Sequence, residues 1–186
     1  MIKPNLWLEV LIKPKETFRK AKNRGNVNGI LFNIVPAVIS GVILDLLSRF
    51  VLYPARVGTS EIYIANYLLS SIATTLILWT VISYLTYWTS RIFHGKGNIR
   101  IHFWLISLFT APMFLLLNLA SFMPYIYYSN VSKAIIVVYS IYLLFLALKE
   151  THNYSSIKSI GNILVLFAVA VVLGFIMTVL YPPIYG

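Results

Sequence analysis

An acidic and a basic side chain stand four residues apart in an apolar stretch of the chain. Asp45 and Arg49 are the only charged residues between Gly29 and Tyr53. Residues spaced i, i+4 share one face of a helix, and ionisable groups inside a bilayer usually face a partner or water because their insertion is costly. The pair predicts either a gate or ion-coupling site or, in our preferred interpretation, a neutralising pair that locks this span while Arg49 reaches outward.

A stripe of small polar side chains follows in the next apolar stretch. Asn66, Ser70 and Thr74 recur at i, i+4 spacing, beside Ser71 and Thr75. Such stripes let helices approach closely and hydrogen-bond in lipid, so helix packing is the first interpretation and the wall of a polar pathway is the second. The candidate intramembrane polar site comprises Asp45, Arg49, Asn66, Ser70 and Thr74, and it can be extended by Asn33, Asn118 and Asn162 from other spans.

The histidines are the weak candidates for a metal site. His94 and His102 flank one connector, and His152 stands near Glu150 in another. Neutral imidazoles and a carboxylate are ligands for zinc and similar ions. The spacings match no ligand motif, however, and the surrounding loops are cationic. We therefore expect no metal here and interpret the histidines as interfacial residues bonded to headgroups and backbone.

Catalytic machinery has no recognisable pattern in the sequence. There is no nucleophile elbow, glycine-rich phosphate loop, HExxH or paired-carboxylate motif. The chain has five acidic residues and no cysteine, which leaves little for general acid–base chemistry and excludes disulfides, thiolate metal sites and cysteine nucleophiles. We predict a protein that is not an enzyme and needs no cofactor.

The elements that position these residues are transmembrane helices. Of 186 residues, 59% are hydrophobic and 11% are charged, with a mean hydropathy of +0.82, whereas soluble domains carry about 25% charged residues. In a soluble protein, the net charge of +10 would indicate binding to nucleic acid. Here the basic residues lie mainly between apolar runs, which indicates membrane orientation and anionic lipid headgroups instead, so we expect no nucleic-acid partner.

The fold class that follows is an all-α integral membrane protein with a bundle of about five transmembrane helices. A span needs roughly 20 apolar residues, which places spans at about 29–53, 64–90, 101–123, 131–148 and 160–181 within a membrane domain of residues 29–186. Pro36 and Pro112 are predicted kinks, because a ring without an N–H interrupts the helix ladder.

Residues 1–28 are predicted to form a short, basic, amphipathic segment at the membrane interface. Leu6, Trp7, Val10 and Leu11 recur at helical spacing before Pro14, and a second short helix follows with Phe18 and Ala21 as its apolar contacts. We expect these two residues to insert shallowly into lipid; a disordered basic tail is the alternative. The candidate face for lipid or partner binding, termed the basic face below, consists of Lys13, Lys15, Arg19, Lys20, Lys22, Arg24, Lys96 and Arg100.

Charge asymmetry predicts the orientation. Twelve of the 15 Lys and Arg residues lie on one side of the predicted spans, and Arg49, Arg56 and Lys133 lie on the other. Because cytoplasmic loops carry the excess of Lys and Arg, we expect a multi-pass protein of the cell membrane with a cytoplasmic amino terminus. With an odd number of spans, the carboxyl terminus is then outside.

Three stretches carry a resemblance to a known family. They are residues 12–43, where a proline and a basic turn with Phe18 precede an apolar span; residues 94–119, where Gly95, Lys96 and Gly97 precede a span with Pro112; and residues 139–167, where a span ends in Lys149, Glu150 and His152 before a serine-rich turn. This arrangement resembles the Yip domain family, membrane proteins named for interacting with Ypt/Rab GTPases. The resemblance implies five spans with a cytoplasmic amino terminus.

The function expected from the residues and the resemblance is non-enzymatic. The long hydrophilic amino-terminal region of the eukaryotic members is missing, so the chain looks more like the prokaryotic branch. We expect a role in membrane organisation, similar to trafficking by resemblance, exerted through anionic lipid headgroups, a homo-oligomer or another membrane protein. The alternative is a small channel or transporter with a polar path along the first and second spans, which would need an oligomer because five spans are few for one pathway.

Overall fold

Helices make up nearly all of the part of the chain that can be described. The structure is a computed structural model that describes residues 5–25, 27–52, 61–123 and 126–180. In chain order the elements are α1 (Asn5–Ile12), α2 (Pro14–Ala21), the 3-10 turn η1 (Lys22–Arg24), α3 (Val27–Leu52), α4 (Glu61–Ile92), α5 (Ile99–Leu119), the 3-10 turn η3 (Ala120–Phe122), α6 (Ile126–His152) and α7 (Ser156–Leu180). The ends of the first and fifth predicted spans, residues 53 and 181, lie outside the described residues, as do Arg56 and the carboxyl terminus.

Two of the long helices end in the same kind of cap. His94 follows α4 with a φ of 60°, and Asn153 follows α6 with a φ of 53°. One residue later, the Gly95 N–H donates to the Ser90 carbonyl at 2.9 Å and the Tyr154 N–H donates to the Lys149 carbonyl at 3.1 Å. These bonds across six residues, with a left-handed residue at the turn, are Schellman caps. The left-handed backbone conformation of His94 therefore closes α4.

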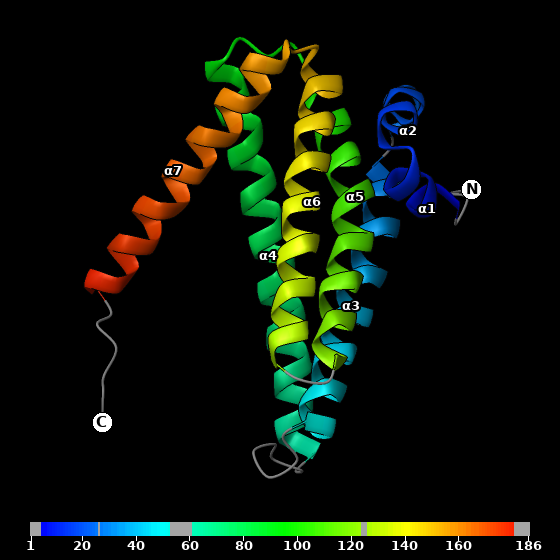
Figure 1. The fold of residues 1–186 in the computed structure, drawn as a ribbon, viewed down its shortest axis with the longest axis vertical. Helices are drawn as coiled ribbons and strands as arrows, with labels where there is room; N and C mark the ends of the chain where they lie inside the picture. Colours follow the sequence, from blue (N-terminus) through cyan, green and yellow to red (C-terminus); the bar gives the residue numbers. More distant parts are fainter. Residues whose placement is uncertain (1–4, 26, 53–60, 124–125, 181–186) are drawn as a thin grey trace.

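The centre of the bundle is α5, which packs between α3 and α6 (Figure 1). Half of its most apolar 18-residue window is buried, against 6% for α4. Glycines on α3 allow the close approach to α5, because a Cβ on Gly29 would lie 2.5 Å from the Trp104 ring and one on Gly41 would overlap the Phe114 ring. Small residues serve close helix packing in membranes in this way, where lipid provides no hydrophobic driving force.

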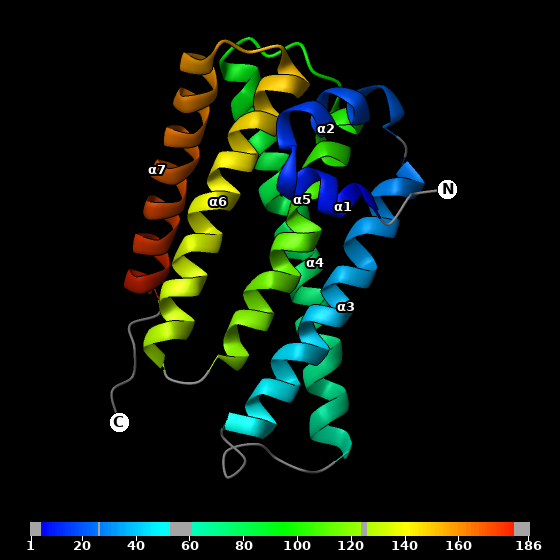
Figure 2. The same cartoon turned by 45° about the vertical axis from the view of Figure 1, so that its right-hand side comes forward.

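The amino-terminal helices lie against the end of the bundle that carries the α4–α5 and α6–α7 connectors (Figure 2). Pro14 opens α2, where its missing N–H costs nothing. The expectation that Phe18 and Ala21 enter lipid is wrong. Phe18 is fully buried and packs edge to face on Phe109 with ring centroids 6.2 Å apart, and Ala21 is 2% exposed. The apolar stripe of α2 covers the core of the bundle rather than a membrane surface.

The predicted all-α membrane bundle is confirmed. Within the described residues, four helical stretches are long and apolar enough to cross a membrane: Val27–Val51, Ile64–Ile92, Ile99–Phe122 and Tyr128–His152. The described side chains of α7 add a shorter apolar helix, Ser156–Val172. In Figure 1, α7 starts beside α4 and α6 and then diverges from them toward its carboxyl end. Pro36 and Pro112 both lie inside helices, α3 and α5.

Candidate functional site

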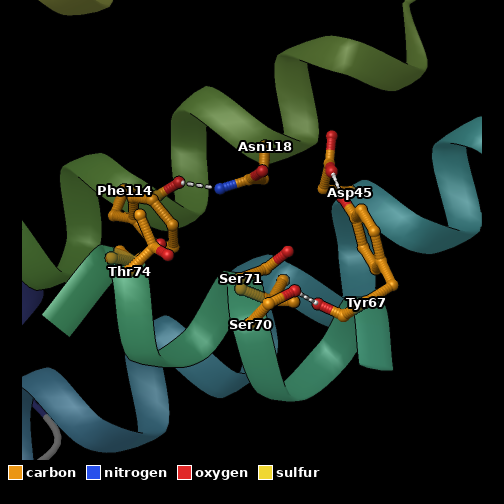
Figure 3. Close-up of a pocket in the computed structure, with 9 residues that line it drawn as sticks. Asp45, Tyr67, Ser70, Ser71, Thr74, Phe114 and Asn118 are labelled. Carbon is orange, nitrogen blue, oxygen red and sulfur yellow. Dashed lines mark hydrogen bonds between the residues drawn. The ribbon is translucent and has the colours of Figure 1, made fainter. Parts of the chain in front are cut away.

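A polar pocket lies between α3, α4 and α5 (Figure 3). It reaches toward the carboxyl end of α3, which is the end of the bundle far from α1 and α2 (Figure 2). Its volume is about 330 Å³. The polar part of the lining comprises Asp45, Tyr67, Ser70, Ser71, Thr74, Thr75 and Asn118, and Val42 and Phe114 complete it. The polar faces of the first two long helices therefore meet at a cavity.

Asp45 is the centre of the contacts at this pocket. Arg49 Nε donates to Asp45 Oδ2 at 3.0 Å, and the Tyr67 hydroxyl on α4 donates to the same oxygen. The Arg49 guanidinium also stands over the Tyr67 ring, 5.4 Å from its centroid. The carboxylate is thus neutralised within its own helix and tied to the neighbouring helix by one bond.

The predicted intramembrane residues are only partly brought together. Asp45, Ser70 and Thr74 line the pocket, and Arg49 adjoins it through the ion pair. Asn66 is exposed and does not line it; its carbonyl accepts the Ser70 hydroxyl at 2.6 Å. Sequence reasoning missed Tyr67 as a site residue. The available signal was its position four residues before Ser71 on the same stripe.

The basic face is assembled from the amino-terminal segment and from a connector in the middle of the sequence. Lys13, Lys15, Arg19, Lys20 and Arg24 are exposed on α2 and its borders, and Lys96 and Arg100 are exposed at the α4–α5 connector. Lys22 is half-buried, and its amino group donates to Asn153 Oδ1 at 2.7 Å. All of these residues belong to elements at the same end of the bundle in Figure 2.

Three hydrogen bonds hold the amino-terminal helices in place. The indole of Trp7 donates to Asn33 Oδ1 at 3.0 Å, the indole of Trp104 donates to the Ala21 carbonyl at 2.9 Å, and the hydroxyl of Tyr139 donates to the Leu11 carbonyl at 2.6 Å. Each bond joins α1 or α2 to a different long helix. With the buried side chains of Val10 and Phe18, they make the basic face a fixed surface rather than a flexible tail.

A buried chain of hydrogen bonds lies beneath the α4–α5 connector. The Gly97 N–H donates to His152 Nδ1 at 3.2 Å, so the proton of a neutral His152 is on Nε2. That nitrogen is 3.1 Å from His102 Nδ1, and His102 Nε2 is 3.1 Å from the Ser83 carbonyl. Every bond in the chain is satisfied when both imidazoles are neutral and carry the proton on Nε2. Both rings are buried, at 0% and 2% exposure.

The connector above the histidines depends on its two glycines. A Cβ on Gly95 would lie 2.6 Å from the Tyr154 hydroxyl, and one on Gly97 would lie 2.6 Å from His152 Nδ1. Arg91 closes the turn from outside by donating to the carbonyls of Gly95 at 3.1 Å and Gly97 at 3.3 Å. The backbone therefore packs directly on the core, and the exposed Lys96 between the glycines is directed to the surface.

Tyr154 and Asn162 extend this polar layer to α7. The Tyr154 hydroxyl donates to the Ser90 carbonyl, and burial raises the pKa of this phenol above its ordinary value. Asn162, fully buried, donates to Ser90 Oγ at 2.6 Å and accepts from Thr89 Oγ1 at 2.7 Å. The sequence suggests Asn162 as an extension of the polar site at Asp45, but it does not line that pocket and bonds to α4 in this layer instead.

The weak metal candidates are not gathered into one site. His102 and His152 are adjacent, but His94 is an exposed cap and Glu150 is half-buried on α6. Among the described residues, no group of three His, Asp or Glu side chains is placed to hold an ion. Both ring nitrogens of His102 and both ring nitrogens of His152 are already used by the chain of hydrogen bonds.

Comparison with known proteins gives a family and no individual relative. A family model described as the Yip1 domain matches residues 8–179 of this chain. Neither the comparison with curated proteins nor the comparison with solved structures gives a match. The matched range begins within α1 and ends one residue before the end of α7, so it takes in the amino-terminal helices together with the long ones.

Proposed function

The chain belongs to the Yip1 domain family and is a multi-pass membrane protein, and from this we propose that it acts without catalysis, by holding anionic lipid headgroups on its basic face. We place that face on the cytoplasmic side of the cell membrane. The observation that carries the proposal is the docking of α1 and α2 on the bundle, which holds their exposed Lys and Arg residues in one place.

Rigid presentation matters because a loose basic tail pays an ordering cost each time it meets a surface. Each basic group near an anionic leaflet is worth about 1 kcal/mol, and the attraction falls off within a Debye length. Glu9 and Glu16 are the described acidic residues on α1 and α2, so the surface keeps a strong net positive charge. An acidic segment of another membrane protein would meet the same charges, and the experiment below separates the two ligands.

The pocket at Asp45 supports a binding site more than a path through one chain. Its polar lining ends at Thr74 and Thr75, and the next turns of α4 present Leu78, Trp79 and Ile82 to an apolar cavity. Within the described part of a single chain, the polar surface therefore stops inside the bundle. This favours the lipid-contact proposal over the channel or transporter alternative.

The test measures lipid selectivity around the full-length protein. In bilayers of neutral lipid, a trace of spin-labelled anionic lipid should be enriched at the protein relative to a spin-labelled neutral lipid, and rising salt should remove the enrichment. A variant with Lys13, Lys15, Arg19 and Lys20 changed to glutamine should lose most of it, whereas Lys133→Gln at the opposite end should not. Equal enrichment for both variants, or enrichment that ignores salt, would contradict the proposal. If the anionic lipid were enriched only in samples that also contain a copurified acidic membrane protein, the basic face would be the binding surface for that protein.

A further inference from the structure

The polar pocket at Asp45 adjoins an apolar cavity on the same helices. This second cavity has a volume of about 410 Å³, and its lining is almost wholly apolar: it includes Leu78, Trp79, Phe109 and Met113. Thr75 and Phe114 belong to the walls of both cavities. The two spaces therefore meet at this pair of residues, with polar groups on one side and apolar groups on the other.

The two cavities also follow each other along the bundle axis. Asp45 on α3 lines the polar pocket and Ile34 on α3 lines the apolar cavity. At 1.5 Å per residue these positions are about 16 Å apart, with Ile34 nearer the middle of the bundle. An elongated molecule with one polar end and one apolar chain of similar length fits this arrangement.

The polar end offers both hydrogen-bond acceptors and donors. Three side chains of the lining already donate: the Tyr67 hydroxyl to Asp45 Oδ2, the Ser70 hydroxyl to the Asn66 carbonyl at 2.6 Å, and one N–H of Asn118 to the Phe114 carbonyl at 2.8 Å. The oxygens of these side chains remain as acceptors, and Asn118 keeps its second N–H as a donor. Figure 3 shows the three residues around one space with Asp45.

This chemistry selects the head of the ligand. A lining with both acceptors and donors suits a head that both accepts and donates hydrogen bonds. Arg49 neutralises Asp45 from the last turn of α3, so a head with a net charge of either sign finds no unpaired opposite charge and loses its hydration. A neutral head with several hydroxyl groups, such as a glycerol, meets both conditions.

We propose that the pocket and the apolar cavity form one binding site for a neutral single-chain lipid, with its hydroxyl-bearing head at Asp45 and Asn118 and its acyl chain beside Trp79. This inference goes beyond the proposed function, because it concerns the opposite half of the bundle and a neutral ligand. The site opens between helices, so the lipid enters from the bilayer. Only 6% of the most apolar window of α4 is buried, so α4 is the helix that has to move aside for the lipid to enter.

The experiment uses a monoacylglycerol with a photoreactive diazirine in the middle of its chain, added to the full-length protein in bilayers. Labelling should saturate, should map to the cavity residues near Trp79, and should be competed by unlabelled monoacylglycerol but not by a fatty acid of the same length. Asp45→Asn should weaken the competition about fivefold, because bonds to a charged acceptor are about twice as strong as neutral ones.

Two tryptophan variants on α4 decide whether the site is specific. Thr75→Trp fills the junction of the two cavities and should abolish saturable labelling, whereas Ile77→Trp, at a position 62% exposed and outside both linings, should leave it unchanged. Both variants should elute as monodisperse, folded protein. Equal labelling of the two variants, labelling that does not saturate, or equal competition by the fatty acid would overturn the proposal. The chain contains no cysteine, so single cysteines introduced at the cavity residues test for a dimer contact, and a disulfide between two copies there would also overturn the proposal.

Discussion

Replacing Phe18 by alanine should release α1 and α2 from the bundle while the long helices stay folded. The Phe18 side chain is fully buried against Phe109 in the core beneath α2. Truncation of a buried phenylalanine to alanine costs about 3–5 kcal/mol. The remaining attachment, the hydrogen bonds of Trp7, Trp104 and Tyr139 to the amino-terminal helices, is unchanged.

The free energy lost on this truncation predicts a measurable increase in the rate of proteolysis. Since every 1.4 kcal/mol is a factor of ten, the population with α1 and α2 released should rise by about a hundredfold or more. Trypsin cleaves after Arg19 and Lys20 only in the released state, and cleavage follows its equilibrium population when opening and closing are fast. Cleavage at these sites should therefore accelerate by a similar factor in protein held in bilayers.

The matched control is Phe32→Ala, which removes the same ring from a position on α3 that is 69% exposed. This variant should be cleaved at the wild-type rate. If Phe18→Ala and Phe32→Ala were cleaved equally fast, the amino-terminal helices would not depend on their buried contacts, and the fixed basic face would lose its support.

Three further predictions concern the connectors and α7. Gly97→Ala should lower the thermal midpoint, because the added methyl group overpacks against His152 at a cost of about 1–3 kcal/mol; Lys96→Ala, at an exposed position, should not. Asn162→Leu removes the two hydrogen bonds that join α7 to Thr89 and Ser90 of α4, each worth about 0.5–1.5 kcal/mol, and should increase the spin-label distance between α4 and α7. Burial raises the pKa of Tyr154 in the folded protein. The protonated phenol therefore stabilises the folded state fully below the ordinary pKa of tyrosine, and this stabilisation is lost as the pH rises through the higher pKa of the folded protein. The thermal midpoint of the wild type should therefore fall more steeply above about pH 10 than that of Tyr154→Phe.

The fold class was readable from the sequence because lipid permits few alternatives. A chain with long apolar runs separated by short charged connectors can satisfy its backbone in a bilayer only as helices or as a closed barrel. The spacing of Asp45 and Arg49 likewise predicted a shared helix face, and the two side chains form an ion pair. The fold class and this ion pair are both determined by the local pattern of residues along the chain.

Contacts between helices were not readable in the same way. Phe18 was assigned to lipid because a short amphipathic helix has the same pattern whether its apolar side meets lipid or protein. The second partner of Asp45 could not be predicted either, since the bond from Tyr67 depends on how α4 is rotated against α3. The positions of His102 and His152 are 50 residues apart in sequence, and only the tertiary fold shows that their rings share a hydrogen bond.

The side of the membrane on which the basic face lies is the claim on which the proposed function depends most directly. The chain contains no cysteine, so single cysteines at Lys96, within the basic face, and at Asn130, near the opposite end of α6, report the orientation without background; both positions are exposed. In intact cells an impermeant thiol reagent should label Asn130→Cys, and it should label Lys96→Cys only after the membrane is permeabilised. Labelling of Lys96→Cys alone in intact cells would place the basic face outside and contradict the account.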